Sequence, residues 1–182
     1  MKRLFAITVV MLLSSAMFFV VVCAAGPTIP TKGRWGGTTT FIIPTPAACG
    51  AAGGVAVSAE GKGVASPWGA STWVGDPTCL FPLIPVPPTD YISYGGKQVF
   101  QGFGTATITA ANGGEIFLEM VFTFIGNPLA ETQGQWTQDV DINGGTGSAM
   151  NAVGHAFSSG VWTNEGGGNL SWEGTHTGTI EY

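Results

Sequence analysis

Charged residues are scarce in this sequence. Only 9% of its 182 residues carry charge, with six Lys and Arg against eleven Asp and Glu. Binding to nucleic acid or to an anionic membrane requires clustered Lys and Arg, so neither partner is expected for the mature domain. Two histidines leave few residues for acid–base or metal chemistry. No window beyond the N-terminal apolar run shows the 3.6-residue apolar period of a helix, so helix is expected to be nearly absent.

The N-terminus has the pattern of a secretory signal peptide. Two basic residues at 2–3 precede an apolar run over 4–22, and small residues at 23–26 supply a cleavage site for signal peptidase. We expect cleavage near Ala25. The mature protein is then a single domain over 26–182, exported to the periplasm or the extracellular space.

Two alternatives to cleavage follow from the same segment. The apolar run is nearly long enough to span a bilayer and to remain as an uncleaved anchor. Cys23 could instead carry a lipid. Bacterial lipoprotein signals place a small residue directly before that cysteine, whereas this chain has Val22 there, which disfavours the lipid.

The mature domain is acidic and retains two cysteines. Without the leader, four basic residues stand against eleven acidic ones, a net charge of −7. Cys49 and Cys79 are an even pair in an oxidising compartment, which favours a disulfide. The alternative is a two-cysteine metal site, but no histidine lies near either cysteine in the sequence.

The second half of the chain carries the clearer strand signals. Two β-rich runs at 97–110 and 115–125 flank Ala111-Asn112-Gly113-Gly114, and Asn-Gly is a strong hairpin signal because both residues tolerate positive φ. The run at 115–125 is apolar on both faces, so we expect it to be central or covered on its second face. Further strands are expected at 135–142 and over 149–163, the latter as a strand pair or as one long bent strand.

The first half is rich in Gly, Ala and Pro and gives weaker signals. Short strands are expected at 38–43, 54–59 and 72–74. The run at 81–88 contains four prolines, each of which removes a ladder donor, so it is expected to be an extended crossing or an edge segment.

The final segment, 170–182, alternates most regularly. Its even positions carry Leu, Trp, Gly, His, Gly, Ile and Tyr, and every odd position is polar, which indicates one face in water and one against a core. Several antiparallel strands with Gly-rich turns predict an all-β sandwich or barrel. Glycines on the inward face favour the barrel, because small inward residues allow the coiling that closure requires.

Three segments carry a family resemblance: 102–114, 142–147 and 178–182. They resemble small secreted bacterial proteins related to the allene oxide cyclase and dirigent barrels, in which a strand runs into an Ala-Ala-Asn/Asp-Gly hairpin and Gly-Gly-Thr-Gly opens the next strand pair. The resemblance spans 97–182 and implies an antiparallel eight-stranded barrel. That family continues Gly-Gly-Thr-Gly with an arginine and an aromatic residue, whereas 148–149 are serine and alanine here. No catalytic residue is carried over.

Four residues are candidate ligand contacts. His176 falls on the apolar face of the last strand and should point inward; it would orient a ligand there, or it is a core histidine bonded to a neighbour. His155 is in phase with apolar neighbours and is expected to share the interior. Trp136 and Trp172 are the candidates among six tryptophans that would suit an aromatic-lined pocket or carbohydrate stacking, and core packing is the alternative.

No motif indicates a catalytic centre, a cofactor or a metal. Asp139 and Asp141 could belong to a calcium or acid–base group, but charges on the outer side of an amphipathic strand are ordinary. Gly144-Gly145-Thr146-Gly147 lacks the lysine and helix of a phosphate loop, and no Gly-x-Ser-x-Gly elbow is present. We therefore expect neither cofactor nor metal.

The leading functional hypothesis is an exported barrel that binds a small apolar molecule without catalysis. The second is a cyclase or isomerase similar to the allene oxide cyclase and dirigent proteins, which would need His155 or His176 within reach of the ligand. The third is a structural surface or envelope protein with a solid barrel and an apolar contact patch.

Overall fold

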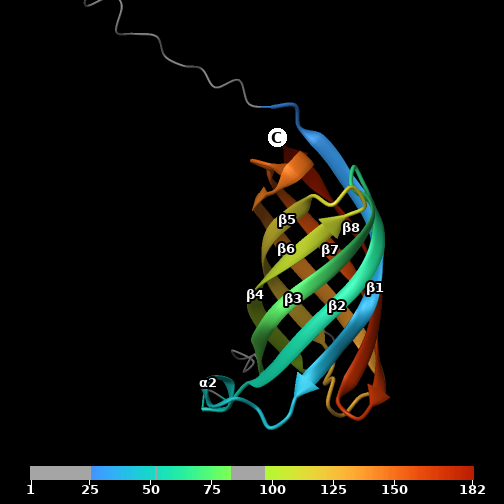
Figure 1. Cartoon of the computed structure of the whole chain (residues 1–182). Coiled ribbons are helices and arrows are strands. Elements are labelled where there is room, and N and C mark those ends of the chain that lie inside the picture. Colours follow the sequence, from blue (N-terminus) through green and yellow to red (C-terminus); the bar gives the residue numbers. More distant parts are fainter. Residues whose placement is uncertain (1–25, 52, 83–96) are drawn as a thin grey trace, which may run out of the picture.

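Eight antiparallel strands close into a barrel in the computed structural model of the protein (Figure 1). The structure describes residues 26–182 except 52 and 83–96, so the expected leader at 1–25 lies outside the described residues. Each strand pairs with its neighbours in sequence, and β8 pairs with β1. The strands are β1 (Ile29–Ile42), β2 (Val55–Ser66), β3 (Gly69–Pro82), β4 (Val99–Ala110), β5 (Glu115–Ile125), β6 (Gln133–Gly145), β7 (Val153–Gly166) and β8 (Asn169–Glu181). The prediction of an all-β, eight-stranded barrel is confirmed, and the sandwich alternative is wrong.

Helix is confined, within the described ranges, to the four-residue α2 (Ala47–Gly50) and the 3-10 turn η1 (Gly147–Ala149). Neither is long and apolar enough to cross a membrane. Cys49 in α2 forms the expected disulfide with Cys79 in β3, with Cα atoms 5.4 Å apart. The bond fastens the β1–β2 connection to the barrel wall.

Three strands in the first half are longer than their sequence signals. β1, β2 and β3 span 14, 12 and 14 residues, whereas the apolar pattern indicated only 38–43, 54–59 and 72–74. Many of the additional strand residues are Gly, Thr, Ser and Ala, which are small or polar and give little apolar alternation. Closure of the barrel supplies both neighbours of each strand and fixes these segments as β structure.

The proline-rich run is corrected at its start. β3 continues to Pro82, which pairs with Phe100 of β4 inside the closed barrel. Pro82 is the last residue of the strand, a position where its missing N–H is tolerated. The rest of that run, 83–88, lies outside the described residues.

The β4–β5 hairpin forms where the Asn-Gly signal predicted it. Gly113 has φ 82°, and Asn112 Oδ1 accepts a hydrogen bond from the Gly114 backbone N–H at 3.0 Å. β5 is central, between β4 and β6, but its second face forms the outer wall, where Phe117 is 41% exposed. Of the two alternatives predicted for this run, the central strand is confirmed and the covered second face is not found. The chain that follows η1 forms one strand, β7, rather than a pair.

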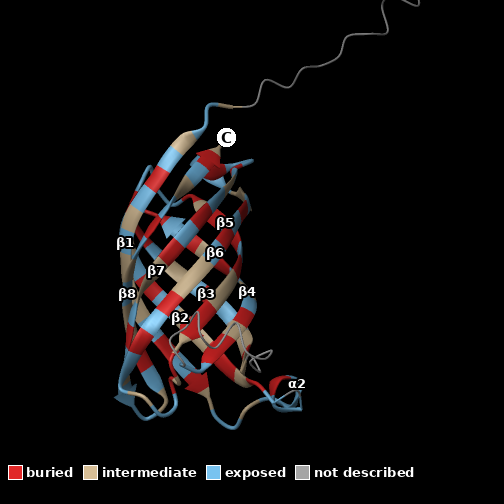
Figure 2. Ribbon diagram, turned by 180° about the vertical axis from the view of Figure 1, so that it is seen from behind, coloured by how far each residue is buried: buried red, intermediate tan, exposed pale blue. Residues whose placement is uncertain are grey.

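β8 confirms the predicted alternation. Leu170, His176 and Ile180 are buried, whereas Thr175 and Thr177 between them are exposed. Figure 2 shows the same alternation of buried and exposed residues along the other strands. One side of every strand therefore builds the interior, and the other side meets solvent.

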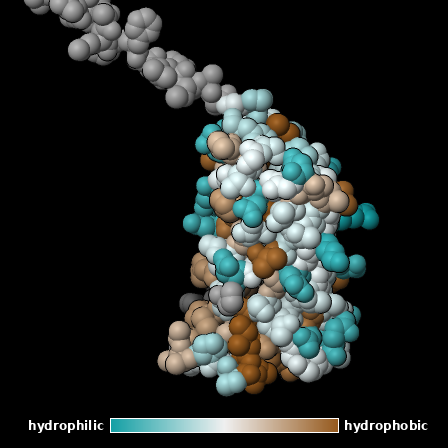
Figure 3. All heavy atoms as spheres, viewed as in Figure 1, coloured by the Kyte–Doolittle hydropathy of each residue, from teal (hydrophilic) through white to brown (hydrophobic). Residues whose placement is uncertain are grey.

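The outer wall is only weakly polar over much of its area. Figure 3 shows mostly pale residues on the face seen in Figure 1, with separate hydrophilic side chains and a hydrophobic strip near the end opposite the C-terminus. All described basic side chains are exposed on this outer surface: Lys32, Arg34, Lys62 and Lys97.

The two ends of the interior are filled by separate apolar clusters. One surrounds Ile116 and Ile180 near the end that carries the C-terminus, and both residues are fully buried. The other surrounds Leu80, Trp162 and Leu170 at the opposite end. The middle of the barrel, between the two clusters, is therefore where a molecule could be held.

Candidate functional site

A cavity of about 110 Å³ lies in the interior, and side chains of both end clusters contribute to its lining. Its walls are mostly apolar, and all eight strands supply residues. Five of the six tryptophans line it, so aromatic rings determine its shape. The aromatic side chains of the lining are Trp35, Trp68, Trp73, Phe122, Phe124, Trp136, Trp172 and His176.

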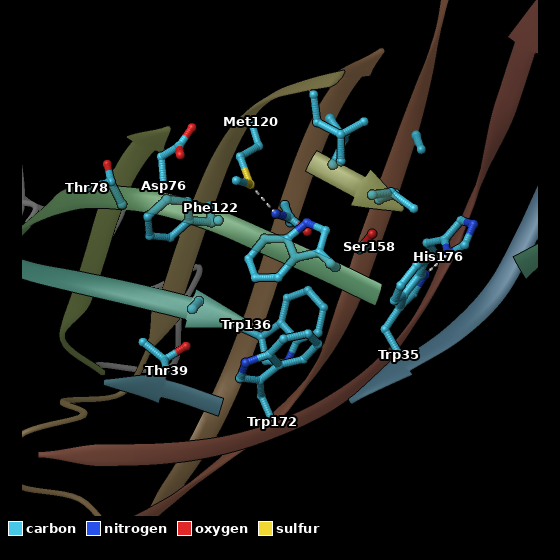
Figure 4. A pocket seen from close by; sticks show the side chains of 18 of the residues that line it. Trp35, Thr39, Asp76, Thr78, Met120, Phe122, Trp136, Ser158, Trp172 and His176 are labelled. Carbon is cyan, nitrogen blue, oxygen red and sulfur yellow. Dashed lines mark hydrogen bonds between the residues drawn. The ribbon is translucent and has the colours of Figure 1, made fainter. Parts of the chain in front are cut away.

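Three tryptophans from three strands meet at the centre of this lining. Trp172 of β8 lies edge-to-face against Trp73 of β3, with ring centroids 5.7 Å apart and an interplanar angle of 83°. It meets Trp136 of β6 in the same manner, at 5.7 Å and 77°. Figure 4 shows Trp136 and Trp172 together in the middle of the pocket. Such pairs are stabilising beyond their area burial, and they hold the rings in fixed orientations.

Inward-facing glycines make room for these rings. A Cβ atom on Gly174 would lie 2.4 Å from Trp136 Cζ2, and one on Gly61 would lie 2.7 Å from Trp172 Cη2. Trp73 folds over Gly75 of its own strand, at 2.8 Å from the same hypothetical atom. Any side chain at these positions would displace a ring, because packed interiors leave no spare volume.

His176 lies at one end of the cavity with both ring nitrogens engaged. Trp35 Nε1 donates to His176 Nδ1 at 2.6 Å, and His176 Nε2 lies 2.9 Å from Thr31 Oγ1. An indole N–H can only donate, so Nδ1 is the acceptor and the proton sits on Nε2, which donates to Thr31. Trp68 stacks on the imidazole at 6.1 Å.

The surroundings keep His176 neutral. Burial away from water lowers the pKa of its imidazole. A second proton would sit on Nδ1 and would face the Trp35 N–H, so protonation would break that hydrogen bond. The imidazole therefore acts as a fixed bridge between β1 and β8.

Few polar groups reach the cavity from its walls. Gln138 Nε2 donates to the Met120 sulfur at 2.6 Å, a weak acceptor that fixes the amide in place. Ser158 pairs across strands with His176, and Thr39 of β1 also lines the cavity. These neutral hydroxyl and amide groups can orient a ligand by donating or accepting hydrogen bonds.

One carboxylate borders the cavity. The pairing of β3 with β4 is irregular between Gly75 and Leu80, and the residues at this irregularity include Asp76 and Thr78, both part of the lining. Asp76 is exposed to solvent, and its Oδ2 accepts a hydrogen bond from the Thr105 hydroxyl. Figure 4 shows Asp76 and Thr78 near Phe122, away from the end that holds His176.

His155 lies on the outer wall, so the prediction that it shares the interior is wrong. Its side chain is 61% exposed, and its Nε2 and Nδ1 each lie 3.0 Å from one oxygen of Asp139 and of Asp141 respectively. Both aspartates are themselves exposed, as expected for the solvated face of β6. An exposed group of this kind contributes little to stability and has no access to the cavity.

The structure brings together three of the four predicted ligand contacts: His176, Trp136 and Trp172 all line the cavity. Asp76 was missed as a lining residue, and Trp73 was only one of the six tryptophans considered for an aromatic-lined pocket. Its neighbours Thr72 and Val74 are polar and apolar respectively, so alternation in the short strand signal at 72–74 did not place Trp73 inward. Pro77, directly after Asp76, was the available signal for the strand irregularity that brings Asp76 to the cavity, because proline within a sheet is confined to edges, strand starts and bulges.

No group of three or more His, Cys, Asp and Glu side chains is arranged to hold a metal ion within the described part of the chain. Comparison of the chain with family models, with curated proteins and with solved structures gives no match. The site is therefore interpreted from its own geometry.

Proposed function

We propose that this protein is an exported β-barrel that holds a small, largely apolar molecule in its interior cavity without converting it. The observation that carries the proposal is the cavity of about 110 Å³ with walls built from five tryptophans. An apolar protein cavity of roughly 150 Å³ binds benzene, so a ligand near that size is the expected occupant. Rigid aromatic walls with few polar groups are typical of small-molecule sites.

A cyclase or isomerase, as the resemblance to allene oxide cyclase and dirigent barrels would imply, has weaker support. A general base must present a free nitrogen or oxygen to its substrate. Both nitrogens of His176 are occupied by Thr31 and Trp35, and His155 lies outside the barrel, so neither histidine predicted for that activity meets this requirement. A structural role with a solid barrel has weaker support too, since the interior retains an open volume.

The proposed location is the periplasm or the extracellular space. The signal-peptide pattern at 1–25 favours export. The disulfide between Cys49 and Cys79 is compatible with an oxidising compartment.

Binding is tested by NMR on protein recovered after export, with benzene as the apolar probe. We expect saturable shifts of the indole N–H signals of the cavity tryptophans, including Trp73 and Trp172. Trp162 lies in the end cluster and not in the lining, so its signal is the internal reference. Native mass spectrometry of the same material identifies any ligand retained from the cell.

Two variants on one strand separate cavity binding from surface binding. Ala156→Leu fills the cavity from β7, and Val161→Leu alters the outer wall of the same strand, where Val161 is 47% exposed. We expect the first to abolish benzene binding and the second to leave it unchanged. Ala59→Val is a second filling variant should Ala156→Leu fail to fold. Wild-type protein without saturable shifts, or filled variants that bind as wild type does, would refute the proposal.

A further inference from the structure

The walls and rim of the cavity specify more than a generic apolar ligand. We infer that the ligand carries an alkylammonium group, a positively charged nitrogen bearing carbon substituents, packed against the tryptophans with Asp76 as its counter-charge. This inference rests on the proposed function, because it names the chemical class of the molecule that the cavity holds.

The arrangement of the aromatic rings supports this class of ligand. Tryptophan has the most favourable ring face for a cation, and quaternary ammonium groups are bound by several such faces at once. Trp172 is nearly perpendicular to both Trp73 and Trp136, and Phe122 is nearly perpendicular to Phe124 at 6.2 Å. Rings set at right angles present π faces in different directions, as a cage around a methylated nitrogen requires.

The sign of the charge around the cavity also supports a positively charged ligand. None of its described lining residues is Lys or Arg, and the described basic side chains all lie on the outer surface. Asp76 is the acidic group of the described lining, and Thr105 holds its carboxylate from the outside. A carboxylate or phosphate ligand would meet no positive partner here, whereas a cation meets a negative one.

Asp76 and the aromatic rings line the same cavity. Trp73 folds over Gly75, the residue directly before Asp76 in β3. His176 does not oppose a cation, because both of its nitrogens are held by neutral partners. The remaining polar groups, among them Gln138 and Ser158, are neutral as well.

Three probes of nearly one shape test this inference: tetramethylammonium, tert-butanol and pivalate, which are positive, neutral and negative. Their dissociation constants are measured by NMR titration of the cavity indole signals at low salt. We expect tetramethylammonium to bind at least about threefold more tightly than tert-butanol, the lower end of cation–π effects. Pivalate should bind most weakly.

Two aspartate variants separate local from overall charge. Asp76→Asn should weaken tetramethylammonium binding severalfold and leave tert-butanol binding unchanged. Asp139→Asn removes the same charge from the outer wall and should alter neither. Trp73→Phe keeps an aromatic ring of weaker π face, so it should weaken binding of the cation more than that of the alcohol. Trp73→Phe therefore preserves the test should Asp76→Asn fail to fold.

The outcomes distinguish this inference from the proposed function. Tert-butanol or pivalate binding as tightly as tetramethylammonium would overturn the inference, as would equal effects of Asp76→Asn and Asp139→Asn on the cation. In those cases benzene binding would still support the proposed function. Failure of benzene and of all three probes to bind would overturn both.

Discussion

Acidification below pH 6.5 should destabilise this barrel through His176. The perturbation is a change from pH 7 to about pH 5. Burial lowers the pKa of His176 in the folded protein, whereas the unfolded chain has the ordinary value of about 6.5. The unfolded state therefore binds more protons below that value, and stability falls as the pH falls. Above pH 6.5 the histidine contribution is fully present.

The size of the effect follows from the single proton that His176 binds in the unfolded chain. A proton bound only by the unfolded chain changes the free energy of unfolding by at most about 1.4 kcal/mol per pH unit. Between pH 6.5 and pH 5 the loss is therefore at most about 2 kcal/mol, which corresponds to roughly 4–8 °C in Tm for a domain of this size. His176 contacts Thr31, Trp35 and Trp68, none of which carries a negative charge that would favour the protonated imidazole.

Chemical denaturation at a series of pH values measures the slope. His176→Gln retains a donor for Thr31 and an acceptor for Trp35 but does not titrate, so its stability should be nearly flat between pH 7 and pH 5. His155→Gln removes the exposed histidine on the outer wall and should keep the slope of the wild type. Parallel pH dependences for wild type and His176→Gln, or a slope that disappears in His155→Gln, would refute the reasoning.

Two further predictions concern the wall. Gly174→Ala places a Cβ atom 2.4 Å from both Trp136 Cζ2 and the Ser159 carbonyl oxygen and should lower the free energy of unfolding by about 1–3 kcal/mol. In Gly36→Ala the nearest atom, the Trp172 carbonyl oxygen, would be 3.3 Å away, so the loss should be smaller than in Gly174→Ala. Equal effects in a urea titration would contradict this packing argument. Cys79→Ser opens a loop of 30 residues and should cost about 3–4 kcal/mol, and reductant should then have no additional effect.

The fold was predictable from the half of the chain in which alternation is strong. The hairpin at Asn112-Gly113 and the pattern of β8 specify antiparallel pairing and one buried face, and inward glycines such as Gly174 and Gly178 indicate closure. β1 to β3 could not be delimited in this way. Their inward positions include Gly33, Gly37, Gly61 and Gly63, which give no apolar signal although each lies beneath a ring or backbone of a neighbouring strand.

The error at His155 has a physical cause in the same packing. Val153 and Phe157 share its side of β7, and apolar neighbours suggested an inward face, yet both are about half exposed on the outer wall. The inward residues of β7 include Ala156 and Ser158, because the space beside them is already occupied by large rings from β6 and β8. Apolar alternation indicates the core only where the interior positions of the strand are also the larger ones.

This exchange of large and small residues explains how the barrel keeps a cavity. A uniform interior of medium-sized side chains would interdigitate and fill the space at native density. Here Trp136 instead packs over Gly174 of β8, and Trp172 packs over Gly37 of β1 and Gly61 of β2, so ring atoms occupy space that side chains at these glycines would take. Indole N–H groups such as that of Trp136, which donates to the Val161 carbonyl at 3.1 Å, anchor the rings there. The cavity is therefore a consequence of rings fixed against the wall, and its volume depends on the glycines as much as on the tryptophans.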